Sequence, residues 1–194
     1  MKIAIISDIH NNIPNLTKVL SYCRENEIEK IICCGDLASI ETLDYLNDNF
    51  TGEIFYTFGN MDNDFLKNYP FEKTDSSTSL GMTYAYKNTK IFKDFGEAEI
   101  DVLQGVELPI GSSTPNKIKI AFVHFPKKAR ELCETGKYDF VFHGHTHKPW
   151  QEKINNCMLL NPGNVGNQIY PPTFAVWNTS DNLFELIHVN KLSQ

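Results

Sequence analysis

The sequence predicts an α/β fold in a single domain that spans residues 1–194. Three short apolar runs, residues 2–6, 28–34 and 53–58, are rich in β-branched residues and have the length of buried strands. Two segments with helical periodicity separate them, and this alternation favours parallel strands because a parallel pair requires a crossover connection. No internal repeat, low-complexity tract or linker divides the chain, and 194 residues are enough to bury one core.

Start signals in the sequence predict three helices. Pro14 fits the first turn of a helix that has Asn12 or Ile13 as its cap. Ser39 is expected to cap a second, short helix. A third helix is expected over residues 127–135, because the glycine that follows suits the position after a last helical turn.

The remainder of the chain is predicted to consist of strands and loops. The polar stretch 63–80 has the composition of a loop, and residues 83–106 alternate weakly, as short antiparallel strands do. Further strands are expected at 106–110 paired with 118–123, at 138–142, at 158–160, and at 173–177 paired with 183–187.

Charge and hydropathy exclude several classes of function. The net charge of −6 and the pI of about 5.5 provide no basic surface of the kind that nucleic acids select. No apolar run approaches the length that spans a membrane, and the run before Asp8 is too short for the core of a signal peptide. We therefore expect a cytoplasmic protein without a membrane partner.

The cysteines give no sign of a disulfide framework or a zinc finger. Their number is odd, no CxxC pair occurs, and the spacings fit neither kind of site. We expect buried or free thiols in a reducing compartment for all five: Cys23, Cys33, Cys34, Cys133 and Cys157.

A short stretch after the predicted strand 138–142 contains the first candidate for metal binding. Gly144 permits a tight exit from the strand, and His145 and His147 follow two residues apart. If the backbone there is extended, both imidazoles point to the same side and form half of a metal site. The alternative is that two polar histidines lie on a solvated turn.

Potential metal ligands also follow four other predicted strands. In open α/β sheets, ligands bind beyond the carboxyl ends of the strands, where neighbouring loops converge. The mixture of carboxylate, amide and imidazole suits Mn, Fe, Zn or Ni better than Ca or Mg, which prefer oxygen alone. Seven ligands are too many for one ion, so two ions are predicted, most simply bridged by Asp36. The candidate metal ligands are Asp8, His10, Asp36, Asn60, His124, His145 and His147.

These motifs together resemble a known family. The chain contains Asp8-x-His10, Gly35-Asp36, Gly59-Asn60-x-Asp62, His124, Gly144-His145-Thr146-His147 and Asn161-Pro162-Gly163-Asn164, in that order. This pattern resembles the calcineurin-like metallophosphoesterase superfamily, and most closely its small YfcE-type phosphodiesterases, over nearly the whole chain. The resemblance implies one metallophosphoesterase domain with two facing mixed β-sheets flanked by helices, an αββα sandwich.

The resemblance also implies the ligand set of each ion. It places metal one on Asp8, His10, Asp36 and His147, and metal two on Asp36, Asn60, His124 and His145. Two ions in such a site clamp the attacking and leaving oxygens of a phosphoryl group, and a metal-bridging hydroxide is the expected nucleophile. The expected ions are two divalent metals, Mn first, with Fe, Zn or Ni as alternatives.

Further roles carried over from the family concern residues around the ions. Asp36, Asn60, Asp62 and His124 are the expected catalytic residues, and Asn12 and Asn60 are expected to contact the substrate. For Asp62 the role is an indirect one, the orientation of a metal ligand, and the alternative is a plain turn residue. For Asn12 the alternative is a helix cap, and Asn161 similarly orients a metal ligand or forms a turn.

Two departures from the family pattern affect the expected substrate. Met61 stands where many relatives have a histidine that assists the leaving group, and a thioether cannot donate a proton. Phe125 and Asn11 stand where glycine is usual, so bulkier side chains narrow or reshape the mouth of the site.

The function predicted from these observations is hydrolysis of a small phosphodiester by a dinuclear metal-dependent enzyme. One alternative is a phosphomonoesterase or nucleotidase of the same fold, against which the absence of a histidine at position 61 argues. The other is a non-catalytic scaffold that binds a partner protein, against which the complete ligand set argues. The sequence does not name the substrate, and it leaves open whether the protein is a homo-oligomer.

Overall fold

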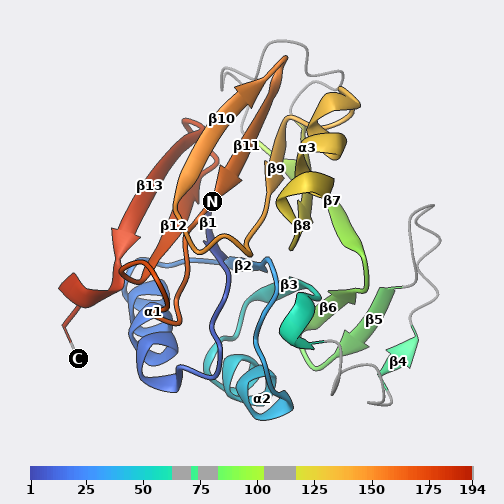
Figure 1. Cartoon of the computed structure of the whole chain (residues 1–194). Helices are drawn as coiled ribbons and strands as arrows, with labels where there is room; N and C mark the ends of the chain where they lie inside the picture. The colour runs from blue at the N-terminus through green and yellow to red at the C-terminus, as the bar shows by residue number, and fades with distance from the viewer. Residues whose placement is uncertain (63–70, 74–82, 103–116, 194) are drawn as a thin grey trace.

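The computed structural model describes residues 1–62, 71–73, 83–102 and 117–193. Within them, two β-sheets pack face to face, and helices cover the outer side of each sheet (Figure 1). Apolar clusters fill all three interfaces: helix on sheet, sheet on sheet, and sheet on helix. This confirms the predicted αββα sandwich.

The first sheet has eight strands in the order β13-β12-β1-β2-β3-β6-β5-β4. Strands β1, β2, β3 and β6 are mutually parallel, as the alternation of strands and helices predicted for the first three. The strands are β1 (Lys2–Ile6), β2 (Lys30–Cys33), β3 (Glu53–Thr57), β4 (Glu72–Lys73), β5 (Thr83–Tyr86), β6 (Thr89–Phe92), β12 (Thr173–Asn178) and β13 (Leu183–His188).

The second sheet has five strands in the order β10-β11-β9-β8-β7. Strand β9 lies parallel to both β8 and β11, whereas the edge strands β7 and β10 run antiparallel to their neighbours. The strands are β7 (Phe95–Asp101), β8 (Lys117–Val123), β9 (Phe140–Phe142), β10 (Trp150–Ile154) and β11 (Cys157–Asn161).

Alternation of side chains along the strands explains how one chain builds three apolar layers. In β1, Ile3 and Ile5 face the second sheet, whereas Ala4 and Ile6 face the helices. All four are fully buried, which accounts for the continuous apolar run of this strand. Trp177 of β12 is likewise buried between the sheets.

The helices begin where the start signals predicted. The Asn12 side chain caps α1 (Ile13–Glu25) by accepting from the backbone N–H of Asn15 at 3.1 Å. Ser39 caps α2 (Ile40–Asn49) through the N–H of Thr42. These two helices cover the first sheet, and α3 (Pro126–Glu134) covers the second (Figure 1). Two short 3-10 helices, η1 (Asn60–Asp62) and η3 (Val189–Lys191), complete the described elements.

Strand pairing agrees with some of the predicted hairpins and differs for one. Strands β12 and β13 form the expected final hairpin, and β5 pairs antiparallel with β6. The expected strand at 106–110 lies outside the described residues, and β8 pairs instead with β7 and β9. Of the predicted loop 63–80, only residues 71–73 are described, and β4 lies within them. Strand β10 was not predicted, because its largely polar edge sequence gives little periodic signal.

The cysteine prediction is wrong for two residues. Cys133 of α3 and Cys157 of β11 form a disulfide across a sequence separation of 24 residues. Each sits on an element whose position depends on the packing of α3 against the second sheet, so no local spacing could indicate the pair. Cys23, Cys33 and Cys34 are free and buried, as expected.

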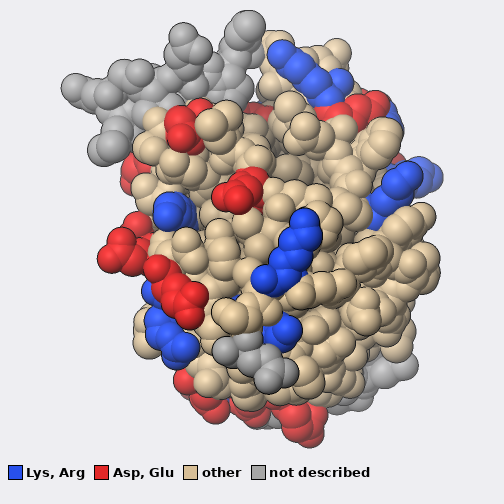
Figure 2. Space-filling model, turned by 90° about the vertical axis from the view of Figure 1, so that its left-hand side faces the viewer, with Lys and Arg blue, Asp and Glu red and all other residues tan. Residues whose placement is uncertain are grey.

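On the face shown in Figure 2, lysines and arginines lie singly among acidic and neutral residues, and they form no continuous basic patch. In the described part of the chain, none of the helices has the length and apolar character needed to cross a membrane.

Candidate metal centre

The predicted ligands converge although they come from both sheets. They follow the carboxyl ends of β1, β2 and β3 in the first sheet and of β8 and β9 in the second. Backbone hydrogen bonds join the loops. The N–H of Asp8 donates to the carbonyl oxygen of Gly35 at 3.0 Å, and the N–H of His10 donates to the backbone carbonyl oxygen of Asp36 at 3.0 Å. The N–H of Gly144 donates to His124 at 3.1 Å and joins the ends of β8 and β9.

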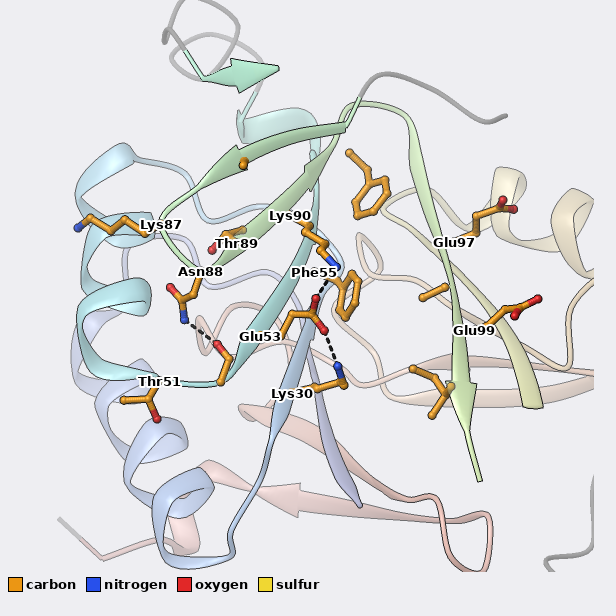
Figure 3. Close-up of a pocket in the computed structure, with 15 residues that line it drawn as sticks. Lys30, Thr51, Glu53, Phe55, Lys87, Asn88, Thr89, Lys90, Glu97 and Glu99 are labelled. Carbon is orange, nitrogen blue, oxygen red and sulfur yellow. Dashed lines mark hydrogen bonds and ion pairs between the residues drawn. The ribbon is translucent and has the colours of Figure 1, made fainter. Parts of the chain in front are cut away.

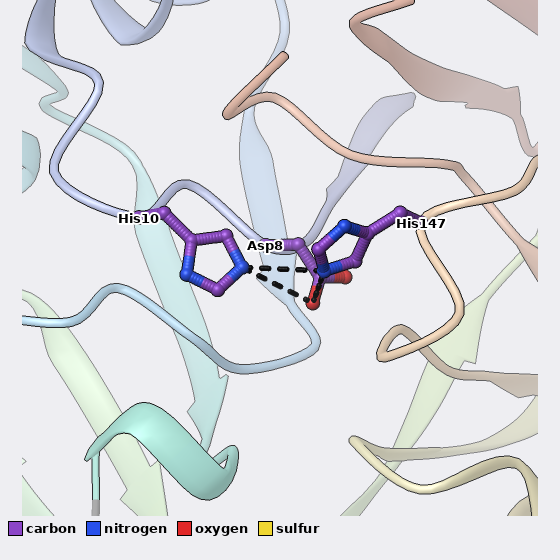
Figure 4. Close-up of side chains that lie close together, drawn as sticks. All are labelled: Asp8, His10 and His147. Carbon is purple, nitrogen blue, oxygen red and sulfur yellow. Dashed lines mark hydrogen bonds and ion pairs between the residues drawn. The ribbon is translucent and has the colours of Figure 1, made fainter. Parts of the chain in front are cut away.

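One cluster consists of Asp8, His10 and His147. Figure 4 shows the two imidazoles directed toward one another, with the Asp8 carboxylate beside them. The Nε2 atoms of His10 and His147 are 3.3 Å apart. Oδ1 of Asp8 lies 3.3 Å from Nε2 of His147 and 3.8 Å from Nε2 of His10.

The other cluster consists of Asp36, Asn60, His124 and His145. Oδ1 of Asn60 lies 3.1 Å from Nε2 of His124 and 3.0 Å from Nδ1 of His145, and these two nitrogens are 3.2 Å apart. Oδ2 of Asp36 lies 3.4 Å from Nε2 of His124. The same oxygen lies 3.8 Å from Nε2 of His10, which places Asp36 between the clusters.

These spacings fit divalent ions. Donor atoms held about 2.1 Å from an ion are about 3.0–3.4 Å from their neighbours in octahedral or tetrahedral coordination. The close contacts within the two clusters, from 3.0 to 3.4 Å, match those edges. The described residues with this capacity include the groups Asp8–His10–His147 and Asp8–Asp36–His124.

The protonation of Asp36, His10 and His145 suits cation binding. Burial alone would raise the pKa of Asp36, but its contact with His124 and the N–H of Met61 hold that pKa below its usual value. Burial lowers the pKa of His10 and His145, so these rings are neutral near pH 7 and can offer a lone pair. The pKa of His124, which burial lowers, is raised overall by the Asp36 carboxylate.

The backbone that carries these ligands is not extended, and the reason given for pairing His145 with His147 is wrong. Both residues have positive φ, 71° and 60°, as do Asp8 at 54°, His10 at 47° and Asp36 at 57°. Left-handed conformations of non-glycine residues cost about 1 kcal/mol or more each and are concentrated at functional sites. The His147 ring contacts His10 in the first cluster, and the His145 ring contacts His124 in the second.

A backbone carbonyl group fixes the orientation of the His124 ring in the second cluster. Nδ1 of His124 lies 2.8 Å from the carbonyl oxygen of Cys34, to which it donates in the tautomer that leaves Nε2 free to face Asp36 and Asn60. Gly35 permits this approach, since a Cβ there would lie 2.6 Å from the same Nδ1 atom.

Gly144 serves a similar purpose in the first cluster. A Cβ at Gly144 would lie 1.8 Å from Oγ of Ser7 and 2.6 Å from Oδ2 of Asp8. Glycine is therefore needed after this strand because any side chain at position 144 would collide with Ser7 and Asp8. Without it, the loop after β9 could not approach Asp8. Both carboxylate oxygens of Asp8 then accept from the N–H of His145, at 3.3 and 3.0 Å.

Asp62 does not belong to either cluster, but its carboxylate binds the backbone of the loops that carry the ligands. Its Oδ2 accepts from the N–H groups of Asp36 at 2.7 Å and Gly59 at 2.8 Å, and its Oδ1 accepts from Ala38 at 2.9 Å. Asp62 is fully buried, and this burial raises its pKa. These contacts agree with the indirect role considered for Asp62, because they join the loops that carry Asp36 and Asn60.

The asparagines of the Asn161–Asn164 motif hold the histidine loop, a role that the sequence did not reveal for Asn164. The Asn161 amide donates to the carbonyl oxygen of Gly144 at 2.9 Å and to Thr146 at 3.0 Å, and it also accepts from the N–H of Gly163. It thus orients the loop and forms a turn. The Asn164 amide donates to the carbonyl oxygen of His147 at 3.1 Å.

The surroundings of the two predicted substrate residues differ. Asn12 uses its amide oxygen to cap α1 and its amide nitrogen to donate to Gly166 at 3.0 Å, so both ends have partners within the protein. Asn60 lies in the second cluster and is exposed. The contact of Asn12 with a substrate therefore stays a prediction, and the geometry agrees with the helix-cap alternative.

A separate cavity of about 750 Å³ opens at the other end of the first sheet. Its lining includes Lys30 and Glu53, which begin β2 and β3, whereas the metal ligands follow the ends of these strands. Figure 3 shows Lys30 and Lys90 directed at the Glu53 carboxylate beside the Phe55 ring. The Glu53 carboxylate therefore already pairs with two ammonium groups and is not a free ligand for a metal ion.

Comparison with known proteins finds phosphoesterases that match over nearly the whole chain. A family model described as the calcineurin-like phosphoesterase superfamily domain matches residues 1–182. Phosphodiesterase MJ0936 of Methanocaldococcus jannaschii is 28% identical over 180 residues, which cover 92% of this chain and 93% of that protein. The solved structure of a novel archaeal phosphodiesterase has a TM-score of 0.72 at 24% identity and covers 97% of this chain and 99% of its own. The phosphoesterase YfcE from E. coli has a TM-score of 0.63 at 16% identity, with 100% and 96% covered.

Proposed function

The chain belongs to the calcineurin-like phosphoesterase superfamily, as its motifs indicated, and from this membership we propose a dinuclear metal-dependent phosphodiesterase that hydrolyses a small phosphodiester. The observation that carries the proposal is the position of Asp36, whose Oδ2 lies between His10 of one cluster and His124 of the other. The name of the M. jannaschii relative, a phosphodiesterase, supports the choice of a diester.

The residues assigned to each ion follow from the two clusters. We assign Asp8, His10, Asp36 and His147 to one ion, and Asp36, Asn60, His124 and His145 to the other. Manganese is the proposed metal, with Fe, Zn or Ni as alternatives, because the donors mix oxygen with imidazole nitrogen and all four metals accept such a mixture. When bound, such ions supply Lewis acidity and neutralise charge on the phosphoryl oxygens.

The protein side chains contribute orientation and charge. Asp36 is ionised and fixed by the N–H of Met61, which donates to its Oδ1 at 2.8 Å. Asn60 is a neutral ligand, so it leaves more of the positive charge of its ion available to the phosphoryl group. Met61 offers no proton to a leaving group. The enzyme is therefore proposed to favour esters whose leaving group departs without protonation.

The test combines metal analysis with turnover of two synthetic esters in Mn²⁺. We expect about two ions per chain, and faster cleavage of bis(4-nitrophenyl) phosphate than of 4-nitrophenyl phosphate. Asp36→Ala should lose both ions and all turnover, whereas Asp48→Ala, at an exposed position on α2, should keep both. Full turnover in Asp36→Ala contradicts the bridging role, and faster cleavage of the monoester contradicts the diester preference.

A further inference from the structure

Phe125 combines exposure with contact to the second cluster. Its side chain is 41% exposed, although aromatic rings of this size are usually buried. The ring centroid lies 5.0 Å from that of His124 and 5.1 Å from that of His145. An apolar face is thus presented to solvent directly beside two of the proposed metal ligands.

The position of Phe125 in the chain is unfavourable for the local structure. It is the N-cap residue of α3, and it makes no side-chain hydrogen bond to the helix. Asn12 and Ser39 perform that function for α1 and α2. A side chain that gives up a capping bond is typical of a site where function overrides local preference.

The backbone around Phe125 is well fixed. Pro126 follows it at the start of α3, and the carbonyl oxygen of Phe125 accepts from the N–H of Ala129 at 3.0 Å. The residue therefore acts as a rigid aromatic anchor. Rigid aromatic rings lose little conformational entropy when a second ring packs on them.

A second exposed apolar residue follows another ligand of the same cluster. Met61 is 50% exposed and comes directly after Asn60, whose Oδ1 contacts both histidines beside Phe125. Methionine is flexible and makes favourable contacts with aromatic rings. Apolar surface thus lies on two of the loops that surround the second cluster.

Resting on the proposed function, we propose that Phe125 is a specificity-determining residue, and that the substrate is a phosphodiester whose retained group, the one that does not leave, is aromatic, as in a nucleoside. The phosphate binds at the ions, and the aromatic group stacks on the Phe125 ring. Stacking of a base on an aromatic side chain tolerates many bases, because each of them has a π-face. A diester whose retained group is a small alkyl chain would fill the ion site but leave Phe125 uncovered, whatever its leaving group.

The test compares two diesters that share one leaving group, so that the chemical step is the same in both. The probes are thymidine 5′-(4-nitrophenyl phosphate) and methyl 4-nitrophenyl phosphate, assayed with Mn²⁺. We expect kcat/KM of the wild-type protein to favour the nucleoside ester by about tenfold. Phe125→Ser should bring the ratio close to one and leave the turnover of the methyl ester within about twofold of wild type.

Phe125→Ser also tests whether a loss of folding explains the effect. Because serine is a good N-cap residue, the melting temperature of the Phe125→Ser protein should equal or exceed that of the wild type. Leu183→Ser, at a residue of β13 that is 66% exposed, is the matched control and should leave the ratio unchanged.

Three outcomes separate the inference from the proposed function. An unchanged ratio in Phe125→Ser, with turnover of the methyl ester intact, overturns the inference alone. A wild-type protein that binds metal but cleaves neither ester overturns the proposed function and the inference with it. If that inert protein instead binds an apolar peptide in a way that Phe125→Ser abolishes, the residue serves a protein partner and the substrate proposal is refuted.

Discussion

Replacement of Asp62 tests whether a buried carboxylate holds the ligand loops in place. Its two oxygens accept three backbone hydrogen bonds, from Asp36, Ala38 and Gly59. Asp62→Asn retains the shape of the side chain but only one acceptor oxygen. Asp62→Ala removes both oxygens. The two variants therefore form a graded series.

The expected magnitudes follow from the amides left without a partner. In Asp62→Asn, the amide oxygen can keep the bonds from the buried Asp36 and Gly59, while its NH₂ group faces the part-buried N–H of Ala38. The one weakened hydrogen bond lowers the free energy of unfolding by about 1–2 kcal/mol. Part of this loss is offset because a neutral amide is less costly to bury than a carboxylate. In Asp62→Ala, two buried donors also lose their partner, and we expect a loss of about 3–5 kcal/mol.

The assay is thermal unfolding together with titration of Mn²⁺ into the metal-free protein. For a chain of this size, each kcal/mol lowers the melting temperature by about 2–4 °C. Affinity for Mn²⁺ should fall in the same order, because the loop that carries Asp36 shifts. Asp48→Asn, on the exposed face of α2, is the control. If Asp62→Ala melts within about 1 °C of wild type and binds Mn²⁺ equally well, Asp62 is only a turn residue.

Three further predictions concern packing and sulfur chemistry. Gly144→Ala should displace Asp8, lower the affinity for metal and reduce the free energy of unfolding by about 1–3 kcal/mol through overpacking. In the control Gly136→Ala, the added Cβ meets no atom within 4 Å, and this variant should keep the metal. Equal loss of metal in both variants would contradict the argument. Replacing Cys133 and Cys157 by alanine should cost about 3–4 kcal/mol through the entropy of the unfolded chain, and an unchanged urea midpoint would show that the disulfide contributes nothing. Titration with a thiol reagent should detect almost no reactive thiol in the native protein, three after unfolding without reductant and five after reduction, because the free thiols are buried; five before reduction would exclude the disulfide.

The fold and the convergence of the site were predictable because both depend on strands. Strand runs and helix caps are local signals, and the carboxyl ends of parallel strands meet at one edge. Asp8, Asp36 and Asn60, which follow three parallel strands, could therefore be placed together before any geometry was known. The extended backbone assumed for His145 and His147 is wrong, because both residues have positive φ.

Other features could not be predicted, because they depend on contacts between distant segments. The pairing of Cys133 with Cys157 follows from the packing of α3 on the second sheet. The contact of Asn164 with the carbonyl oxygen of His147 depends on how the loop after β11 folds back. Strand β10 lies at a sheet edge, where polar residues are tolerated on both faces.

The origin of the ligands has a thermodynamic consequence. Asp8, Asp36 and Asn60 follow strands of the first sheet, whereas His124, His145 and His147 follow strands of the second. An ion held between them would therefore link the two halves of the sandwich. A ligand that binds only the folded chain, at a free concentration of 1,000 times its Kd, adds about 4 kcal/mol to the free energy of unfolding. Metal supply would then govern how much of this protein persists in the folded state, as well as how fast it works.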